Sequence, residues 1–177
     1  MRIRSAIESD AVQIAEIHVS SWRTTYKGIV PDSYLDNLSV AKRTLLWEKQ
    51  LDEGNEGSKI FVAENEAGQI IGFVSGGRNR LESMPFDSEI YAIYLLEDYQ
   101  RQGIGELLMS SIASFLTDQG FKSTYLWALE DNRYRSFYEK RGGLPAGRED
   151  IEIDSVKLGE IAYGWHQLDR LKAQSKK

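Results

Sequence analysis

The stretch Glu89-Ile-Tyr-Ala-Ile-Tyr-Leu-Leu-Glu-Asp-Tyr-Gln-Arg-Gln-Gly-Ile-Gly-Glu-Leu-Leu-Met109 joins a dense apolar run to a glycine-containing turn and then to an amphipathic pattern. Residues 90–96 are uncharged and rich in aromatic and branched side chains, which predicts a short strand buried on both faces. After Gly103 the apolar residues recur at helical spacing as far as Gly120. The stretch therefore predicts a strand, a loop and a helix.

The loop at residues 100–105 lies where the predicted strand passes into the helix. The first N–H groups of a helix have no intrahelical partner, and the helix dipole adds about half a positive charge at that end. Gly103 and Gly105 have no Cβ atom that would hold an anion away. The loop therefore predicts a phosphate or pyrophosphate site, and a turn that needs glycine only for its shape is the alternative. It matches neither the P-loop nor the three-glycine dinucleotide fingerprint.

In this setting the loop resembles the acyl-CoA loop of the GCN5-related N-acetyltransferases, whose pattern is Gln/Arg-x-x-Gly-x-Gly/Ala. Gln100, Gly103 and Gly105 match it, whereas Arg101 stands where the family commonly has glycine and would add a cation beside the pyrophosphate. The resemblance implies acetyl-CoA as acyl donor, with an amide near Leu95 polarising the thioester carbonyl. The cofactor-binding residues that it implies here are Ile93, Tyr94, Leu95, Gln100, Arg101, Gln102, Gly103, Ile104, Gly105 and Glu106.

A second segment, Asn132-Arg-Tyr-Arg-Ser-Phe-Tyr-Glu-Lys-Arg-Gly142, resembles the family pattern Asn-x-x-Ala-x-x-Phe-Tyr-Glu-Lys-x-Gly-Phe. Arg135 stands at the alanine position and Gly143 replaces the final aromatic residue. The resemblance places the Asn132 amide on the pantetheine arm or elsewhere on the cofactor, with simple helix capping as the alternative. The matching residues are Asn132, Phe137, Tyr138, Glu139, Lys140 and Gly142.

Tyr138 and Glu89 are the candidates for proton transfer. A tyrosine beside a thioester sulfur can protonate the departing thiolate, so Tyr138 is the candidate acid and also a cofactor-binding residue; the alternative is a core tyrosine whose hydroxyl is satisfied locally. An attacking amine must be neutral, and Glu89 at the start of an apolar strand is the candidate base, directly or through a water. The alternative for Glu89 is a strand-edge carboxylate in solvent or in a salt bridge.

Composition limits the classes of function. The chain has 177 residues, 41% hydrophobic and 28% charged, with a net charge of -5 that argues against nucleic-acid binding. The absence of cysteine excludes disulfides, thiolate metal sites and an acyl-cysteine intermediate. His18 and His166 have no recognisable metal-ligand partner, so we expect no metal. No secretory segment and no run of eighteen apolar residues is present, which predicts a cytoplasmic protein without a membrane partner.

The remaining sequence predicts helices and strands in a regular order. Ser9 is a candidate N-cap, and residues 9–53 predict two or three helices, the first of which ends near Trp22. Asn65-Glu-Ala-Gly68 predicts a hairpin connection. We expect strands at residues 2–6, 60–64, 69–75, 123–129, 147–154 and 159–168, a flexible link at 76–85 and a short helix at 132–141.

These elements predict one α/β domain over residues 1–171, followed by a solvated tail at 172–177. The expected architecture is a mixed, mostly antiparallel sheet of six or seven strands flanked by helices, with a parallel strand–helix–strand crossover over residues 89–129. The resemblance adds that the two strands of this crossover splay apart around the pantetheine arm. It also implies that homodimers are possible.

The expected function is transfer of an acetyl group from acetyl-CoA to a primary amine of a small molecule or peptide, by direct transfer in a ternary complex. Trp22 and Tyr26 lie in the helical segment that in this family covers the acceptor pocket, so they and Glu89 are candidate substrate-binding residues; helix packing is their alternative. A protein that binds acyl-CoA but has lost catalysis, acting as a sensor or interaction module, is the alternative function.

Overall fold

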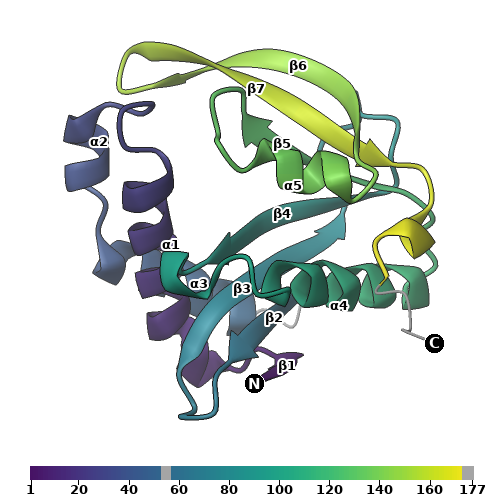
Figure 1. Ribbon diagram of the computed structural model, residues 1–177, viewed down its shortest axis with the longest axis horizontal. Helices are drawn as coiled ribbons and strands as arrows, with labels where there is room; N and C mark the ends of the chain where they lie inside the picture. Colours follow the sequence, from purple (N-terminus) through teal and green to yellow (C-terminus); the bar gives the residue numbers. More distant parts are fainter. Residues whose placement is uncertain (53–56, 173–177) are drawn as a thin grey trace.

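The computed structural model describes residues 1–52 and 57–172, which form one seven-stranded sheet in the order β1-β2-β3-β4-β5-β7-β6. All neighbouring strands are antiparallel except β4 and β5, which are parallel. The predicted mixed, mostly antiparallel sheet is therefore confirmed (Figure 1). The strands are β1 (Arg2–Ser5), β2 (Ser58–Glu64), β3 (Ile70–Arg78), β4 (Ser88–Leu95), β5 (Thr124–Leu129), β6 (Leu144–Ile153) and β7 (Val156–Trp165).

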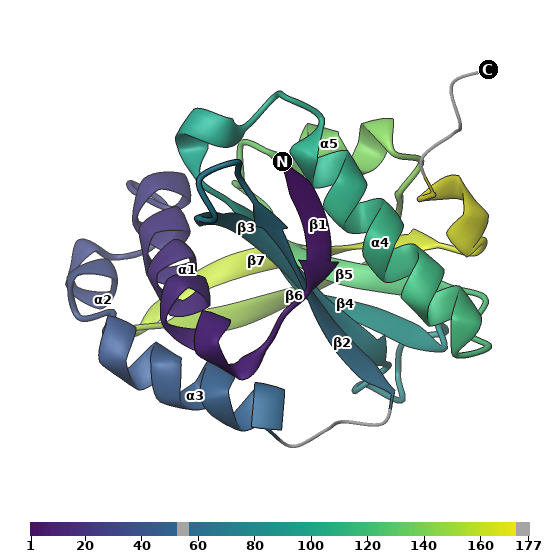
Figure 2. The same ribbon diagram turned by 90° about the horizontal axis from the view of Figure 1, so that it is seen from below.

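Helices cover both faces of the sheet (Figure 2). Helix α4 packs on one face through Leu108 and Ile112, and α1 and α3 pack on the other through Ile14 and Trp47. Helix α4 carries its apolar residues at helical spacing, as the sequence predicts, and so buries a single stripe. The helices are α1 (Ala11–Thr25), α2 (Asp32–Asp36), α3 (Val40–Asp52), α4 (Ile104–Asp118) and α5 (Arg135–Lys140).

The start of α1 differs from the sequence-based expectation. Ser9 is not the N-cap, because residues 8–10 form a short 3₁₀ turn before the helix. Asp10 stands at the N-cap position instead, but its carboxylate accepts the Ile7 N–H of the 3₁₀ turn at 2.9 Å, not an N–H of α1, and is held by the Arg4 guanidinium at 2.7 Å. The helix then continues past Trp22 to Thr25. Glu53, the last residue of the predicted helical segment, lies outside the described residues.

The sequence predicts that residues 90–96 are buried on both faces. Strand β4 is instead buried over only part of its length. Its first three residues are buried and the rest, from Tyr91 onward, are half-buried. The strand buried on both faces is β3, which extends to Arg78 through part of the expected flexible link. The difference has a structural cause, because β5 pairs with β4 only at Ser88 and Glu89 and then leaves its edge.

A β-bulge accompanies this separation. The register of β3 with β4 shifts between Ser75 and Gly76, so that Tyr91 is an extra residue on β4. A bulge bends its strand and increases the local twist. Because Tyr91 follows the last β4–β5 pair at Glu89, the bend lies where the two strands part. The splaying that the family resemblance implies is therefore present.

The opposite end of the β4–β5 pair is held closed. The Ser88 hydroxyl donates to the Ser123 carbonyl at 2.6 Å. The Asp87 carboxylate accepts the N–H groups of Lys122 and Ser123, each at 2.8 Å, and also the Ser123 hydroxyl. These bonds fix the amino ends of β4 and β5 together, so that the strands diverge only toward their carboxyl ends.

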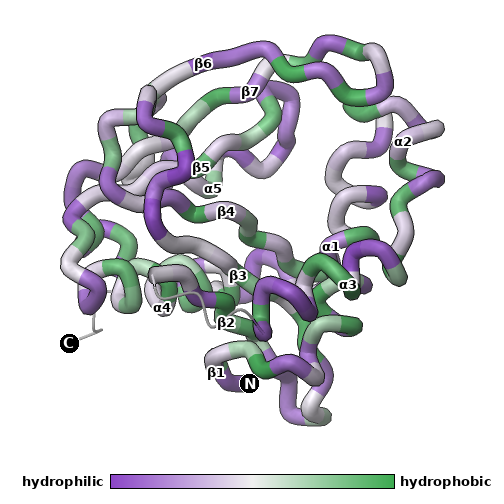
Figure 3. Tube along the Cα trace, turned by 180° about the vertical axis from the view of Figure 1, so that it is seen from behind, coloured by the Kyte–Doolittle hydropathy of each residue, from purple (hydrophilic) through white to green (hydrophobic). Residues whose placement is uncertain are grey.

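The β6–β7 hairpin arches over the open end of the sheet, with hydrophilic and hydrophobic residues alternating near its tip (Figure 3). The final described residue, Lys172, pairs with Asp169 at 2.7 Å, and the remainder of the predicted tail lies outside the described residues. Within residues 1–52 and 57–172 no helix combines the length and apolar character needed to cross a bilayer.

Candidate active site

A cavity of about 680 Å³ opens where β4 and β5 separate. Its walls come from five segments: the end of α1 with Tyr26, most of β4, the loop before α4, the facing part of β5 and the segment 132–140 that leads into and forms α5. The volume lies in the range of small-molecule and cofactor sites. The residues that line it from these segments include Ile93, Tyr94, Leu95, Gln100, Arg101, Gly103, Gly105, Glu106, Trp127, Asn132, Arg133, Tyr134, Tyr138 and Lys140.

The loop before α4 presents unpaired backbone donors to this cavity. Gly103 is the N-cap of α4 and has a φ of +82°, a conformation that glycine adopts without steric cost. Within the described residues, the first hydrogen bonds back to the Gly103 carbonyl come from Glu106 and Leu107, which leaves the N–H groups at residues 103–105 without a backbone acceptor. A Cβ atom on Gly105 would lie 3.2 Å from the Phe137 ring, so that glycine serves packing against α5, whereas a Cβ atom on Gly103 would meet nothing within 4 Å and the space beside the loop is open there. These features fit a diphosphate group, which needs several donors and a close approach to the backbone.

Arg101 adopts the conformation that its position normally reserves for glycine. Its φ is +61°, in the left-handed region that is strained for a residue with a Cβ atom. Its side chain is exposed and borders the cavity. Where the chain departs from the family pattern, the backbone of Arg101 is therefore strained, and its side chain adds a cation at the edge of the cavity.

Three polar side chains of the predicted cofactor loop hold the loop itself. Gln100 Nε2 donates to the Leu95 carbonyl at 3.2 Å, and Gln102 Nε2 donates to the Asp98 carbonyl at 3.0 Å. Glu106 forms an ion pair with Arg141 at 3.2 Å. The structure therefore ties the loop to the end of β4 and to the segment after α5.

Gln102 and Ile104 do not line the cavity. The Gln102 side chain is engaged with Asp98, and the Ile104 side chain is buried in the core beneath α4. Any contact of these two residues with a ligand must come from their backbone N–H groups. The sequence pattern identifies the loop correctly, but it does not separate side chains that face the cavity from those that support it.

Tyr138 projects from α5 into the same cavity. No hydrogen bond to its hydroxyl is found among the described residues, so the local partner that the core alternative requires is absent there. Burial raises the pKa of the Tyr138 hydroxyl, and the neighbouring Tyr94 and Tyr163 raise it further. The phenol therefore keeps its proton at neutral pH, which a proton donor requires.

Asn132 has a capping contact as well as a position on the cavity wall. Its side-chain oxygen accepts the Tyr134 N–H at 2.9 Å, just before α5 begins, and the residue is buried. This contact is the helix-capping alternative of the sequence analysis. The side-chain amide nitrogen can still donate to a ligand, because it is the oxygen that accepts the Tyr134 N–H.

The sequence model of the acetyltransferase (GNAT) family matches residues 14–143, which include both the loop before α4 and Tyr138. The chain belongs to this family. It is 39% identical to an uncharacterized N-acetyltransferase of Bacillus subtilis, YuaI, over 96% of this chain and 95% of that protein. Its membership of the GNAT family and its similarity to this relative show that the chain is an acyltransferase.

Two other GNAT proteins are informative. The spermidine N(1)-acetyltransferase of Thermoplasma acidophilum is 25% identical over 80% of this chain and 87% of that protein. The crystal structure of the PaiA N-acetyltransferase from Thermoplasma acidophilum in complex with coenzyme A has a TM-score of 0.68, with 23% identity over 90% of this chain and 96% of that one. The second comparison shows the GNAT fold.

A second cavity, of about 280 Å³, adjoins the first and shares with it lining residues of β4 and β5. Trp22, Tyr26 and Glu89 line it, so the structure brings together the three candidate substrate-binding residues of this GNAT protein. Trp22 Nε1 donates to the Tyr94 hydroxyl at 2.8 Å. This bond holds the Tyr94 side chain, which lines both cavities. We call this cavity the acceptor pocket; its lining residues are Trp22, Tyr26, Arg80, Glu89, Ile90, Tyr91, Tyr94, Trp127, Ala128, Leu129, Ile151, Ile153 and Glu160.

Glu89 has a partner that the sequence did not reveal. Arg80 binds both oxygens of its carboxylate, with Nε at 3.0 Å and the terminal nitrogen at 2.6 Å. The Arg80 guanidinium also lies 4.2 Å from the centre of the Tyr91 ring. These contacts give Glu89 the salt bridge that was its alternative role, and they leave its carboxylate less accessible to an incoming amine.

The sequence analysis missed several residues of the two cavities. Arg133 and Lys140 add cations to the first cavity, at positions inside the second motif that the family pattern leaves variable or assigns no role. Arg80 lies in the segment expected to be a flexible link. Glu160 had a detectable signal, because it interrupts an apolar alternation with Leu158 and Ala162 along one face of β7.

Replacement of Arg101 separates the two effects found at this position. Arg101→Gly removes both the backbone strain and the cation, so we expect unchanged or increased stability together with an about two- to fivefold weaker affinity for coenzyme A, the effect of one exposed charge. Arg101→Lys is the matched control that retains the cation and should keep most of the affinity. Calorimetric titration with coenzyme A and urea unfolding measure both quantities; equal affinity of wild type and Arg101→Gly would contradict the assignment.

Proposed function

We propose that this protein transfers the acetyl group of acetyl-CoA directly to a primary amine while both substrates are bound. The observation that supports the proposal most is the wall shared by the two cavities, since Tyr26, Tyr94 and Trp127 line both. A donor in the first cavity and an acceptor in the second would meet at these residues. The chain has no cysteine to form an acyl-enzyme, so direct transfer requires the fewest steps.

The residues of the first cavity fit the parts of acetyl-CoA. The N–H groups at residues 103–105 would hold the diphosphate, and Arg101, Arg133 and Lys140 supply cations for the nucleotide phosphates. The edge of β4 at Ile93, Tyr94 and Leu95, which β5 leaves unpaired, would pair with the pantetheine amides. Acetyl-CoA supplies an acyl group that is activated as a thioester.

The chain's own groups would handle the protons. Tyr138 donates its hydroxyl proton to the sulfur that departs, and Asn132 orients the donor from the neighbouring wall. An N–H near Leu95 donates to the carbonyl oxygen as charge develops there. Because Arg80 occupies both oxygens of Glu89, we assign the removal of the ammonium proton to a water that Glu89 orients.

The acceptor is an amine of a small molecule or peptide. A cationic acceptor agrees with the net charge of -5 and with the relative named spermidine N(1)-acetyltransferase. A screen of amines, polyamines and peptides for release of free coenzyme A tests the proposal. Binding of acetyl-CoA without release in any mixture would favour the catalytically silent sensor, for which the masked carboxylate of Glu89 is the supporting observation.

Tyr138→Phe tests the proton donor. The change removes one oxygen atom and keeps the ring, so we expect the turnover number to fall about 100-fold or more while the affinity for acetyl-CoA changes little. Steady-state kinetics with the best amine of the screen and calorimetric titration measure the two quantities. A turnover number equal to that of wild type would remove Tyr138 from this role.

Glu89→Gln tests the water-orienting role. Gln has nearly the same shape but cannot attract a proton through charge, so we expect a lower turnover number and a smaller effect on the KM for the amine. Arg80 is itself exposed, which allows the unpaired guanidinium to be solvated and the fold to persist. If turnover is unchanged while urea unfolding shows a loss of stability, Glu89 serves only as the ion-pair partner of Arg80.

A further inference from the structure

Glu160 places a carboxylate on an apolar wall. It lies on β7 between Leu158 and Ala162, and side chains two residues apart on a strand share one face. Leu158 and Ala162 both pack in hydrophobic clusters, with Tyr26 and Trp127 among the neighbours of these clusters. On β7, Glu160 therefore places a charge between two apolar residues of this face, and it lines the acceptor pocket.

No cation of the described part of the chain pairs with Glu160. Among residues 1–52 and 57–172 no hydrogen bond or ion pair reaches its carboxylate. Two arginines near this region are engaged elsewhere: Arg80 pairs with Glu89, and Arg148 pairs with Glu130 at 3.0 Å and with Asp150 at 2.9 Å. The charge of Glu160 thus remains uncompensated within the described structure.

The nearest charge across the sheet makes this arrangement less favourable. Glu149 lies directly opposite Glu160 in the β6–β7 register, and like charges opposite each other in an antiparallel pair are destabilising. Burial, followed by the charge of Glu149, raises the pKa of Glu160. Tyr26, which follows α1, and Tyr94 from β4 line the same pocket as this carboxylate and are themselves neutral at physiological pH.

Such a carboxylate is satisfied best by a cation that arrives from solution. The other two charges of the acceptor pocket, on Glu89 and Arg80, neutralise each other, so the pocket carries one net negative charge from Glu160. Its aromatic residues include Trp22 and Trp127, and aromatic rings attract ammonium groups. The pocket therefore combines a free carboxylate with aromatic walls.

We infer that Glu160 binds an ammonium group of the acceptor, an inference that rests on the proposed function. The pocket then selects amines that have no adjacent carboxylate, such as alkyl polyamines. The residues that line the pocket offer no free cation for an acceptor carboxylate, because Arg80 is held by Glu89. An amino acid would also bring its own negative charge close to Glu160. Selection then follows from attraction of one charge and repulsion of the other.

Glu160→Gln tests the inference with spermidine as the cationic probe and glycine as the probe with an adjacent carboxylate. Loss of a charge-assisted contact should raise the KM for spermidine about tenfold or more, with a smaller change in turnover number. Wild type should acetylate spermidine in strong preference to glycine. Glu152→Gln is the matched control: it removes a charge of the same sign from the opposite, exposed face of β6, away from Ile151 and Ile153, and should leave the KM for spermidine unchanged.

A stability measurement distinguishes binding from a structural role. A carboxylate whose pKa is higher in the folded than in the unfolded state weakens folding as the pH rises through the interval between the two pKa values. At pH 7 the Glu160→Gln variant should therefore be as stable as wild type or more stable in urea. Lower stability together with an unchanged KM would identify Glu160 as structural and overturn the inference.

Binding of spermidine to the coenzyme A complex, followed by calorimetry, separates this inference from the proposed function. Binding that depends on Glu160, without acetyl transfer to any amine, would refute the function and retain the cation site. Acetyl transfer with a wild-type KM in Glu160→Gln would retain the function and refute the cation site. Failure of wild type to bind spermidine, or a preference for glycine, also overturns the inference.

Discussion

The site depends on the early end of the β4–β5 pairing. After Ser88 and Glu89 the bulge at Tyr91 bends β4, while β5 stays paired with β7 along its whole length. A strand that keeps one partner and loses the other has an edge of free N–H and C=O groups, and here that edge lines a cavity instead of bulk solvent. The hydrogen bonds of Asp87 and Ser88 at the closed end prevent the strands from separating completely. The same geometry places the loop before α4 and the Tyr138 hydroxyl on either side of one opening.

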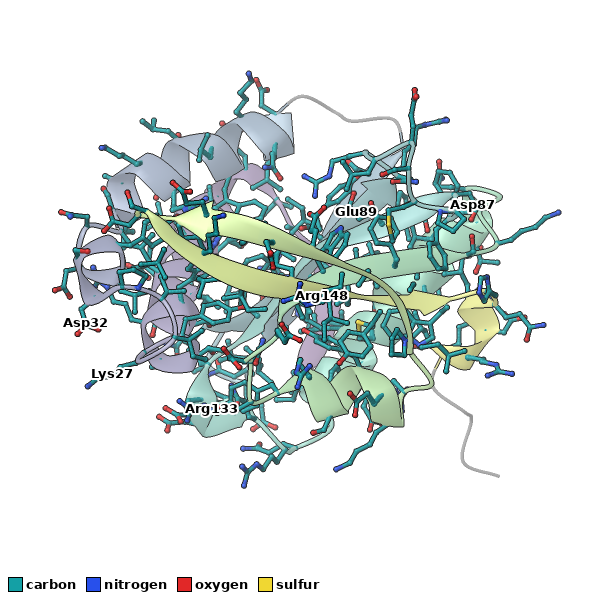
Figure 4. All side chains as sticks on the ribbon, turned by 90° about the horizontal axis from the view of Figure 1, so that it is seen from above. Lys27, Asp32, Asp87, Glu89, Arg133 and Arg148 are labelled. Atoms are coloured by element: carbon teal, nitrogen blue, oxygen red, sulfur yellow. The ribbon has the colours of Figure 1, made fainter. Side chains whose placement is uncertain are left out.

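Charge is distributed unequally between the two sides of this opening. In the view of Figure 4, Arg133 and Glu89 lie on opposite sides of the β6–β7 hairpin that carries Arg148. Arg133 borders the first cavity, where free amides, Arg101 and Lys140 also favour an anion. Glu89 and Glu160 border the acceptor pocket, which has an excess of negative charge. Under the proposed function, this distribution would direct an anionic donor and a cationic acceptor into different cavities, which meet at Tyr26 and Tyr94.

The sequence predicts local features well and long-range features poorly. The change from an apolar run to helical spacing around Gly103 locates the loop that lines the first cavity, because both signals lie within twenty residues and reflect backbone geometry. The bulge at Tyr91 depends on pairing with β3, and the ion pair of Glu89 depends on Arg80 in a loop without regular pattern. The contact of Gln100 with the Leu95 carbonyl likewise arises only once the loop has folded back on β4. Residues that a motif groups together therefore divide into those that face the ligand and those that support the loop.

The claim on which the others rest is that the free amides at the start of α4 bind the diphosphate of the donor. Amide NMR spectra recorded during a titration with coenzyme A test it directly, because they report on each N–H separately and require no turnover. The account predicts the largest shifts at Gly103, Ile104 and Gly105, with smaller ones at Ile93 to Leu95, and no comparable change on addition of spermidine alone. Unchanged signals at residues 103–105 under saturating coenzyme A would contradict it.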